Sequence, residues 1–198
     1  MAKLYFKYGA MGCSKTAQAL ITKFNYEERG MKVLLMKPSA DNRDGANIVK
    51  SRIGLTSEAV TVEPSQDLFE LYKEKYENCN VIIVDECQFL TPEQVDELSN
   101  IVIEFNIPVL CFGLATDFLT HLFPGSRRLF EIAESISEIK SVCRCGTKAT
   151  VNARLDDNGN VVYSGEQVVI GGNDRYVAMC RKCWLNKRRE QEERGLYL

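Results

Sequence analysis

Residues 9 to 16 read Gly-Ala-Met-Gly-Cys-Ser-Lys-Thr, and this stretch decides the fold. It follows the apolar and aromatic run of residues 4–8, which predicts a strand, and apolar residues then recur at helical spacing through residues 17–24. Strand, glycine-containing loop, Lys-Thr and helix form the context of a phosphate-binding P-loop. In such a loop, backbone N–H groups and the helix N-terminus surround the phosphates, Lys15 reaches the outer phosphates, and Thr16 can bind Mg²⁺.

Position 14 departs from the usual P-loop pattern, which has glycine immediately before the lysine. Glycine lets the backbone approach the phosphates closely, whereas the Cβ of Ser14 restricts that approach. Ser14 must therefore adopt a backbone conformation open to L-residues or accept strain of about 1–3 kcal/mol, and we expect Gly12 to absorb part of the distortion. Taken alone, the motif also fits a strand-to-helix turn with a solvated lysine.

A second segment, Val81–Val84, is a continuous apolar and β-branched run that predicts a strand buried on both faces of a parallel sheet. It ends in Asp85 and Glu86. An acid at the carboxyl end of such a strand is where nucleotide enzymes hold Mg²⁺, and a second carboxylate could accept a proton from an attacking hydroxyl. Acids also end strands on the solvent side, but the coincidence with a P-loop favours a nucleotide-binding site.

The bulk properties are typical of a soluble enzyme. The chain has 198 residues and 45% hydrophobic residues, and no apolar run approaches the ~20 residues that span a bilayer. The first residues enter a strand without a signal-peptide pattern, so we expect a cytoplasmic protein and no membrane partner. The net charge of −2 and pI of about 5.6 argue against a nucleic-acid partner. The basic cluster at 187–189 precedes three glutamates and predicts a frayed, charged tail.

Eight cysteines fall into two groups. Four are isolated and read as small, mostly buried thiols, namely Cys13, Cys79, Cys87 and Cys111. The other four form two close pairs whose spacing predicts a structural Zn²⁺ site, with free thiols or a redox pair as the alternative. These predicted zinc ligands are Cys143, Cys145, Cys180 and Cys183. Four sulfur ligands would leave no open position on the metal, so the zinc would not be catalytic.

Strands alternate with helices along the first 140 residues. Further strands are predicted at 31–36, before Pro38, and at 109–112. A helix is predicted over 66–77, and Thr91-Pro92-Glu93-Gln94 predicts another helix start with a capping box. This alternation predicts an α/β fold with a parallel sheet.

The remaining segments carry turn signals. Residues 39–60 lack steady periodicity and predict a mobile loop with at most a short strand. From about Ser141 the sequence changes to short strands with turns at 156–159 and 171–172. We therefore expect a P-loop nucleotide-binding α/β domain over 1–140, a zinc-binding lobe over 141–186, and a charged C-terminal tail over 187–198.

The chain resembles the type II thymidine kinases, a family with a RecA-like P-loop domain and a small zinc lobe. The resemblance extends to about Trp184 and is carried by several motifs. Besides the P-loop and the four paired cysteines, these are Asp85-Glu86-Cys87-Gln88-Phe89, Gly113-Leu114-Ala115-Thr116-Asp117-Phe118 and Val169-Ile170-Gly171-Gly172-Asn173-Asp174-Arg175-Tyr176.

The resemblance implies transfer of the γ-phosphate of ATP to the 5′-hydroxyl of thymidine or deoxyuridine. It assigns Glu86 as general base, and Lys15 and Arg43 as further catalytic residues. Positions implied for ATP and Mg²⁺ are Gly9, Ala10, Met11, Gly12, Cys13, Ser14, Lys15, Thr16, Asp41, Asp85 and Gln88. Positions implied for the nucleoside are Met11, Leu114, Phe118, Phe123, Ile170, Gly171 and Tyr176. The resemblance also implies a homotetramer and feedback inhibition by thymidine triphosphate.

Other interpretations remain open from the residues themselves. Asp41-Asn42-Arg43 also reads as a polar turn, and the aromatic residues also read as core. The P-loop and Asp85 do not identify the phosphate acceptor, so a different phosphotransferase or an ATPase is one alternative. A zinc-ribbon module that senses a nucleotide or nucleic acid without turnover is another.

Overall fold

The computed structural model describes residues 1–43, 45–165, 167 and 175–196. Its α-helices are α1 (Lys15–Glu27), α2 (Leu68–Lys75), α3 (Pro92–Phe105), α4 (Pro124–Ile132) and α5 (Arg181–Glu193), and the short 3₁₀ helix η1 spans Cys87–Phe89. Its strands are β1 (Leu4–Tyr8), β2 (Val33–Pro38), β3 (Ile48–Lys50), β4 (Thr56–Glu58), β5 (Val60–Val62), β6 (Val81–Val84), β7 (Val109–Gly113), β8 (Ser135–Glu138), β9 (Ser141–Val142), β10 (Lys148–Ala149), β11 (Val151–Arg154) and β12 (Tyr176–Met179).

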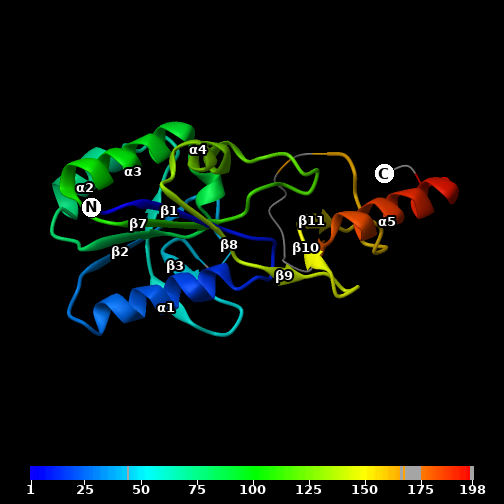
Figure 1. Ribbon diagram of the computed structural model, residues 1–198, viewed down its shortest axis with the longest axis horizontal. Helices are drawn as coiled ribbons and strands as arrows, with labels where there is room; N and C mark the ends of the chain where they lie inside the picture. Colours follow the sequence, from blue (N-terminus) through cyan, green and yellow to red (C-terminus); the bar gives the residue numbers. More distant parts are fainter. Residues whose placement is uncertain (44, 166, 168–174, 197–198) are drawn as a thin grey trace.

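A parallel sheet organises the larger part of the molecule, as the sequence predicts. Six of the described strands form it, in the order β5-β2-β6-β7-β1-β8. Helix α1 covers one face, and α2, α3 and α4 cover the other (Figure 1). Strand β6 is buried along its whole length because both faces of the sheet are covered. The α/β fold and the buried strand are therefore confirmed.

The local start signals are also confirmed. Helix α3 begins with the predicted capping box: Gln94 N–H donates to the Thr91 hydroxyl, and the Gln94 side chain accepts from Thr91 N–H. Strand β2 begins two residues later than predicted, because Met31 N–H still donates to the Tyr26 carbonyl in the turn that closes α1. Within α1, Ile21 and Phe24 are exposed, so the apolar pattern predicts the helix but not its buried face.

The prediction of at most a short strand within residues 39–60 is wrong. Strands β3 and β4 pair as an antiparallel hairpin, and β5 joins the main sheet beside β2. Polar residues hide these strands from periodicity, because only Val49 of the hairpin strands is buried. The hairpin therefore places an ordered segment beside the P-loop.

The C-terminal lobe comprises the described residues from 141 to 196 and extends from one end of the sheet (Figure 1). It contains two strand pairs, β9 with β10 and β11 with β12, together with α5. The basic cluster at 187–189 belongs to α5 and is not a frayed tail. Gln191 anchors this helix, since its side chain is buried and exchanges hydrogen bonds with both backbone groups of Val161. Among the residues described, none forms a helix long and apolar enough to cross a membrane.

Candidate active site

The P-loop connects β1 to α1 and reaches its tightest point at Ser14. Ser14 has a left-handed backbone (φ 63°), and Gly12 is also left-handed (φ 75°). Ser14 therefore accepts the strain that its Cβ imposes, and Gly12 shares the unusual geometry. The Ser14 hydroxyl donates to the Cys13 carbonyl (2.6 Å) and does not cap the helix. The first amides of α1 thus keep the capacity to bind an anion.

Lys15 lies buried at the floor of the P-loop. Its ammonium nitrogen donates to the carbonyl oxygens of Gly9 (3.2 Å) and Ala10 (3.0 Å) and lies 3.6 Å from the sulfur of Cys13. Gly9, Ala10 and Cys13 thus hold the Lys15 ammonium group and do not themselves face the pocket. Only Lys15 among these four residues lines the pocket itself.

Asp85 follows β6 and is nearly inaccessible, with 3% of its surface exposed. Burial, followed by the charge of Glu86, raises the pKa of Asp85 to about 7, while a hydrogen bond with the Thr16 side chain opposes the rise. A buried carboxylate beside a P-loop hydroxyl suits a divalent cation, because the cation would restore the ionised form. Thr16 and Asp85 therefore fit a Mg²⁺ site.

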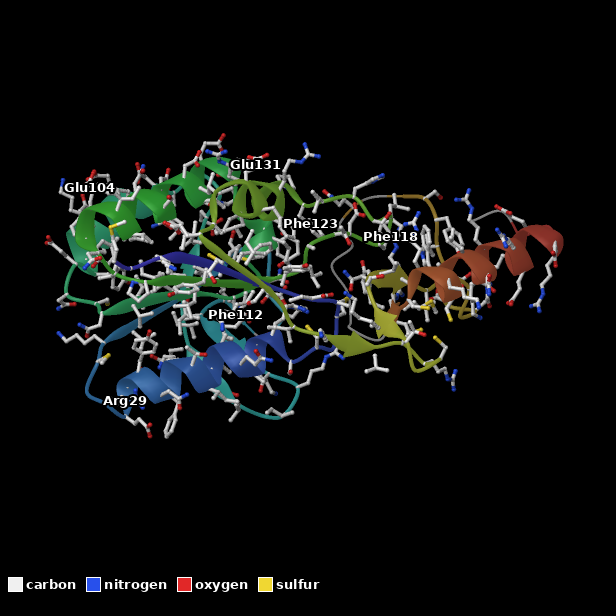
Figure 2. All side chains as sticks on the ribbon, viewed as in Figure 1. Arg29, Glu104, Phe112, Phe118, Phe123 and Glu131 are labelled. Carbon is white, nitrogen blue, oxygen red and sulfur yellow. The ribbon has the colours of Figure 1, made fainter. Side chains whose placement is uncertain are left out.

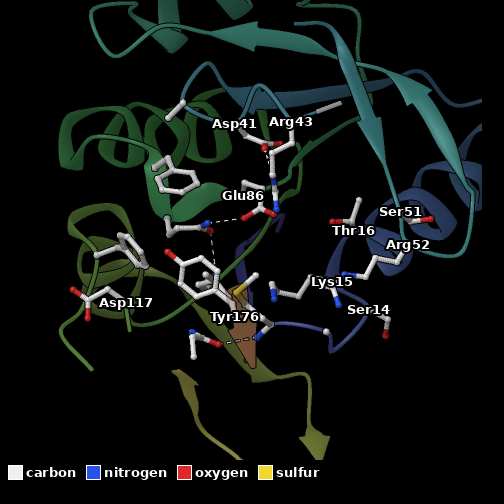
Figure 3. Close-up of a pocket in the computed structure, with 18 of the residues that line it drawn as sticks. Ser14, Lys15, Thr16, Asp41, Arg43, Ser51, Arg52, Glu86, Asp117 and Tyr176 are labelled. Atoms are coloured by element: carbon white, nitrogen blue, oxygen red, sulfur yellow. Dashed lines mark hydrogen bonds and ion pairs between the residues drawn. The ribbon is translucent and has the colours of Figure 1, made fainter. Parts of the chain in front are cut away.

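Glu86 has both carboxylate oxygens engaged. Arg43 donates to Oε1 (2.6 Å) and Gln88 donates to Oε2 (2.6 Å). Burial acts to raise the pKa of Glu86, but the charges of Arg43 and Lys15 and these hydrogen bonds outweigh burial and hold the pKa below its usual value. Glu86 is also left-handed (φ 52°), an uncommon conformation for a residue with a side chain. The structure thus presents an ionised, fixed carboxylate (Figure 3).

Arg43 lies between two carboxylates, since its Nε donates to Asp41 Oδ1 (2.6 Å) while its other end contacts Glu86. The loop that carries it is anchored by Lys37, whose ammonium group is fully buried and donates to the carbonyls of Gly45 (2.8 Å) and Ile48 (2.9 Å). Asp41 and Arg43 therefore line the pocket, whereas Asn42 between them is exposed to solvent.

A pocket of about 280 Å³ joins these groups, near the lower end of the range for small-molecule sites. Thirteen of the residues predicted for the site line it: Met11, Gly12, Ser14, Lys15, Thr16, Asp41, Arg43, Glu86, Gln88, Leu114, Phe118, Phe123 and Tyr176. Ile170 and Gly171 lie outside the described residues. The pocket has a polar half at the P-loop and an aromatic half beyond Gln88.

The aromatic half lies between the sheet and the C-terminal lobe, where Figure 2 labels Phe118 and Phe123. The guanidinium of Arg154 stacks 3.7 Å from the centre of the Phe118 ring. Phe123 packs edge-on against Phe89, with ring centres 5.7 Å apart. Phe118 is 1% exposed, so it forms part of the buried apolar wall of this half of the pocket.

Sequence reasoning missed several pocket residues. Asn152 of β11 accepts from Met11 N–H (2.8 Å) and donates to the Thr116 carbonyl (2.9 Å), so it ties the lobe to the P-loop. The Asp117 carboxylate accepts a hydrogen bond from Gln167 Nε2 (3.0 Å). Asp117 lies inside a motif already noted, whereas no local pattern marks an asparagine in a short strand. The hairpin contributes four more lining residues: Lys50, Ser51, Arg52 and Ile53.

The four paired cysteines meet in the C-terminal lobe as predicted, with their sulfur atoms all within 4.8 Å of one another. The sulfurs of Cys145 and Cys180 are 3.7 Å apart. Zinc with four bonds of about 2.3 Å would separate its sulfurs by about 3.8 Å. Hydrogen bonds from Thr147 are the main cause that lowers the pKa of Cys145 to about 6, whereas hydrogen bonds with Cys145 and Cys180 raise the pKa of Cys183 to about 12, so it is the sulfur geometry that supports the metal site. The cluster therefore fits a tetrahedral Zn²⁺ ion.

Comparison with known proteins agrees with this geometry. The sequence model of the family described as "Thymidine kinase" matches residues 2–184. A thymidine kinase of Yersinia pseudotuberculosis is 47% identical over 184 residues, which cover 92% of this chain and 94% of that protein. A thymidine kinase of enterobacteria phage T4 is 47% identical over 186 residues, which cover 93% of this chain and 96% of that protein. One from Zymomonas mobilis is 45% identical over 189 residues, which cover 94% of this chain and 98% of that protein.

Among solved structures, a chain described as a DNA replication initiation factor aligns with 70% of this chain and 40% of its own length. Its TM-score is 0.41 and its sequence identity 14%, a likeness too weak to support a conclusion.

Proposed function

The chain belongs to the thymidine kinase family and is an ATP-dependent nucleoside kinase, and on that premise we propose that Glu86 is the base of the phosphoryl transfer. In this proposal Glu86 takes the proton of the 5′-hydroxyl of thymidine. The hydroxyl oxygen forms a bond to the γ-phosphorus as the bond to the β–γ bridging oxygen breaks. Thymidine monophosphate and ADP leave, and the proton passes from Glu86 to solvent.

One observation carries the proposal. The Glu86 carboxylate stands at the junction of the polar and aromatic halves of the pocket, fixed by Arg43 and Gln88 (Figure 3). A general base must lie within hydrogen-bond reach of the proton that it removes, and this junction is where a nucleoside hydroxyl would meet a phosphate. The lowered pKa supports a base that is ionised at neutral pH.

The polar half would bind the phosphate donor. The backbone of residues 9–16 and Lys15 would hold the phosphates, and Thr16 and Asp85 would hold Mg²⁺. Bound Mg²⁺ neutralises charge that develops on the phosphate oxygens. Arg43 would stabilise the equatorial oxygens of the transferred group, because its guanidinium already lies beside the base.

The aromatic half would bind the nucleoside. Phe118 would stack on the pyrimidine, with Met11, Leu114 and Phe123 around it, and Tyr176 would contact the sugar. The lining of the pocket supports these assignments. Ile170 and Gly171, for which the same role is proposed, lie outside the described residues.

The remaining proposals concern the state of the protein. We assign Zn²⁺ a structural role in the cysteine cluster, because four sulfur ligands complete its coordination. A homotetramer and inhibition by thymidine triphosphate rest on the family resemblance, and a cytoplasmic location rests on the bulk properties of the sequence.

Glu86→Gln tests the proposal, because the amide keeps the shape of the side chain and removes the proton acceptor. With labelled thymidine and Mg-ATP, we expect the turnover number to fall by ~10²-fold or more while ATP affinity is retained. Glu104→Gln serves as the control, since Glu104 is an exposed carboxylate at the end of the molecule far from the pocket (Figure 2). Near-normal turnover of Glu86→Gln would exclude Glu86 as the base.

A further inference from the structure

The turn of the β3–β4 hairpin, residues 51–55, is held by hydrogen bonds of Ser51. Ser51 N–H donates to the Leu55 carbonyl (2.8 Å), Leu55 N–H donates to the Ser51 hydroxyl (3.0 Å), and Gly54 N–H donates to the Ser51 carbonyl (3.0 Å). Ser51 is 4% exposed, and Gly54 supplies the left-handed residue that the turn needs (φ 90°). The backbone of Arg52 and Ile53, at the tip of this turn, is therefore held in a defined position, and both side chains are exposed.

That position is beside the P-loop. An ideal Cβ placed on Gly12 would lie 3.6 Å from Nη1 of Arg52, so the guanidinium lies close to the loop. Figure 3 shows the Arg52 side chain reaching from the hairpin toward Lys15. Arg52 lines the pocket together with Ser14, Lys15 and Thr16. Two cations of separate elements thus converge on the phosphate-binding half.

The two arginines that line the pocket, Arg43 and Arg52, differ in whether a carboxylate neutralises their charge. Arg43 is compensated by Asp41 and Glu86 at 2.6 Å each. In the part of the chain that the structure describes, no carboxylate lies within ion-pair distance of Arg52. A guanidinium directed at a P-loop without a carboxylate partner is suited to a phosphate, whose oxygens match its planar fork.

We propose that Arg52 binds the polyphosphate of the phosphate donor, so that the hairpin closes the phosphate subsite against the P-loop. The inference rests on the proposed function, because it assumes that residues 9–16 hold the donor phosphates. Arg52 then acts as a donor-binding residue with no contact to thymidine, whose half of the pocket lies beyond Gln88. Ser51 is the positioning residue that fixes the turn.

The test measures affinities by calorimetry on the full chain, for Mg-ATP and for inorganic tripolyphosphate, which lacks the base and sugar. We expect Arg52→Gln to lower the affinity for both ligands by about tenfold or more, the usual effect of losing a charge-assisted hydrogen bond. Arg52→Lys should recover part of the affinity, since it keeps the charge and loses the fork. Arg29→Gln is the matched control, because Arg29 is exposed and lies in the turn that follows α1, at the end away from the P-loop (Figure 2).

Thymidine affinity without donor should be the same in all four proteins. Unchanged affinity of Arg52→Gln for both phosphate ligands would overturn the inference, even if turnover fell, because the hairpin would then have a structural role only. A lower affinity for Mg-ATP with an unchanged affinity for tripolyphosphate would also overturn the inference, because Arg52 would then contact the base or the sugar of ATP. Failure of the unsubstituted protein to bind Mg-ATP or to phosphorylate thymidine would instead contradict the proposed function.

Discussion

The parallel-sheet domain and the C-terminal lobe hold their functional residues in place by different means. The domain has two large apolar clusters, one on each face of the sheet, and every residue of β6 and β7 is buried. The lobe has paired strands and only two small apolar clusters: one has four buried residues of the lobe, and the other has three, among them Cys143 and Cys180, together with Ala10 of the P-loop. A small unit with little core commonly needs a metal or another staple. Apolar burial thus positions Asp85 and Glu86, whereas the cysteine cluster must support the lobe.

The two regions meet at the P-loop. Ala10 packs in the same cluster as Cys143, Ala149 and Cys180. Asn152 adds the polar link between Met11 and Thr116. The P-loop is therefore in direct contact with the lobe that carries the cysteine cluster. We therefore expect a structural change in the lobe to weaken ligand binding at the pocket before it destabilises the parallel sheet.

Metal removal should have the largest effect on thymidine affinity. If it had none, the cysteine cluster would not be needed to hold the lobe in place. We expect one zinc per chain in the native protein, and we expect chelation or Cys180→Ser to reduce thymidine affinity by ~10²-fold before the sheet domain unfolds. Metal analysis, calorimetry with thymidine and circular dichroism measure the three quantities. Cys79→Ser is the control, because Cys79 packs against the apolar core far along the chain from the cluster. Native protein without stoichiometric zinc would refute the assignment.

Removing the polar link should have a smaller effect. Asn152→Ala leaves Met11 N–H and the Thr116 carbonyl without the partners that they have now, at a cost of about 1–3 kcal/mol for each buried group that stays unsatisfied. We therefore expect thymidine affinity to fall about tenfold with zinc content unchanged. Asn158→Ala, in an exposed turn of the same lobe, should change neither quantity. Equal affinity of the two variants would show that the lobe is connected to the P-loop only through its apolar contact.

The smallest effect is expected at Ser14, within the P-loop itself. Ser14→Gly removes a left-handed serine, whose strain costs about 1–2 kcal/mol, and adds the backbone entropy of glycine, so the net stabilisation should be at most about 1 kcal/mol. We expect the melting temperature to rise by a few degrees. ATP affinity or turnover should increase slightly, and thymidine affinity should not change. A drop in activity would mean that the Ser14 hydroxyl contacts phosphate directly.

The sequence by itself determined the elements whose cause is local or strongly periodic. The P-loop motif, the apolar run of Val81–Val84 and the capping box at Thr91 each act within a few residues, so they could be predicted without the rest of the chain. The cysteine spacing likewise predicted the cluster that the structure brings together. The roles of Glu86 and Arg43 came from the family resemblance, and they stay predictions.

Tertiary structure alone decided the contacts between distant segments. The hairpin at 48–58 has little buried apolar surface, so no periodicity marks it, and it is held by strand pairing and by the packing of Val49 against α1 and β2. Asn152 reaches Met11 across 141 positions, and Gln191 reaches Val161 across 30. The exposed face of α1 at Ile21 and Phe24 shows the same limit. Hydrogen bonds and burial depend on which surfaces the fold brings together, and a local pattern does not contain that information.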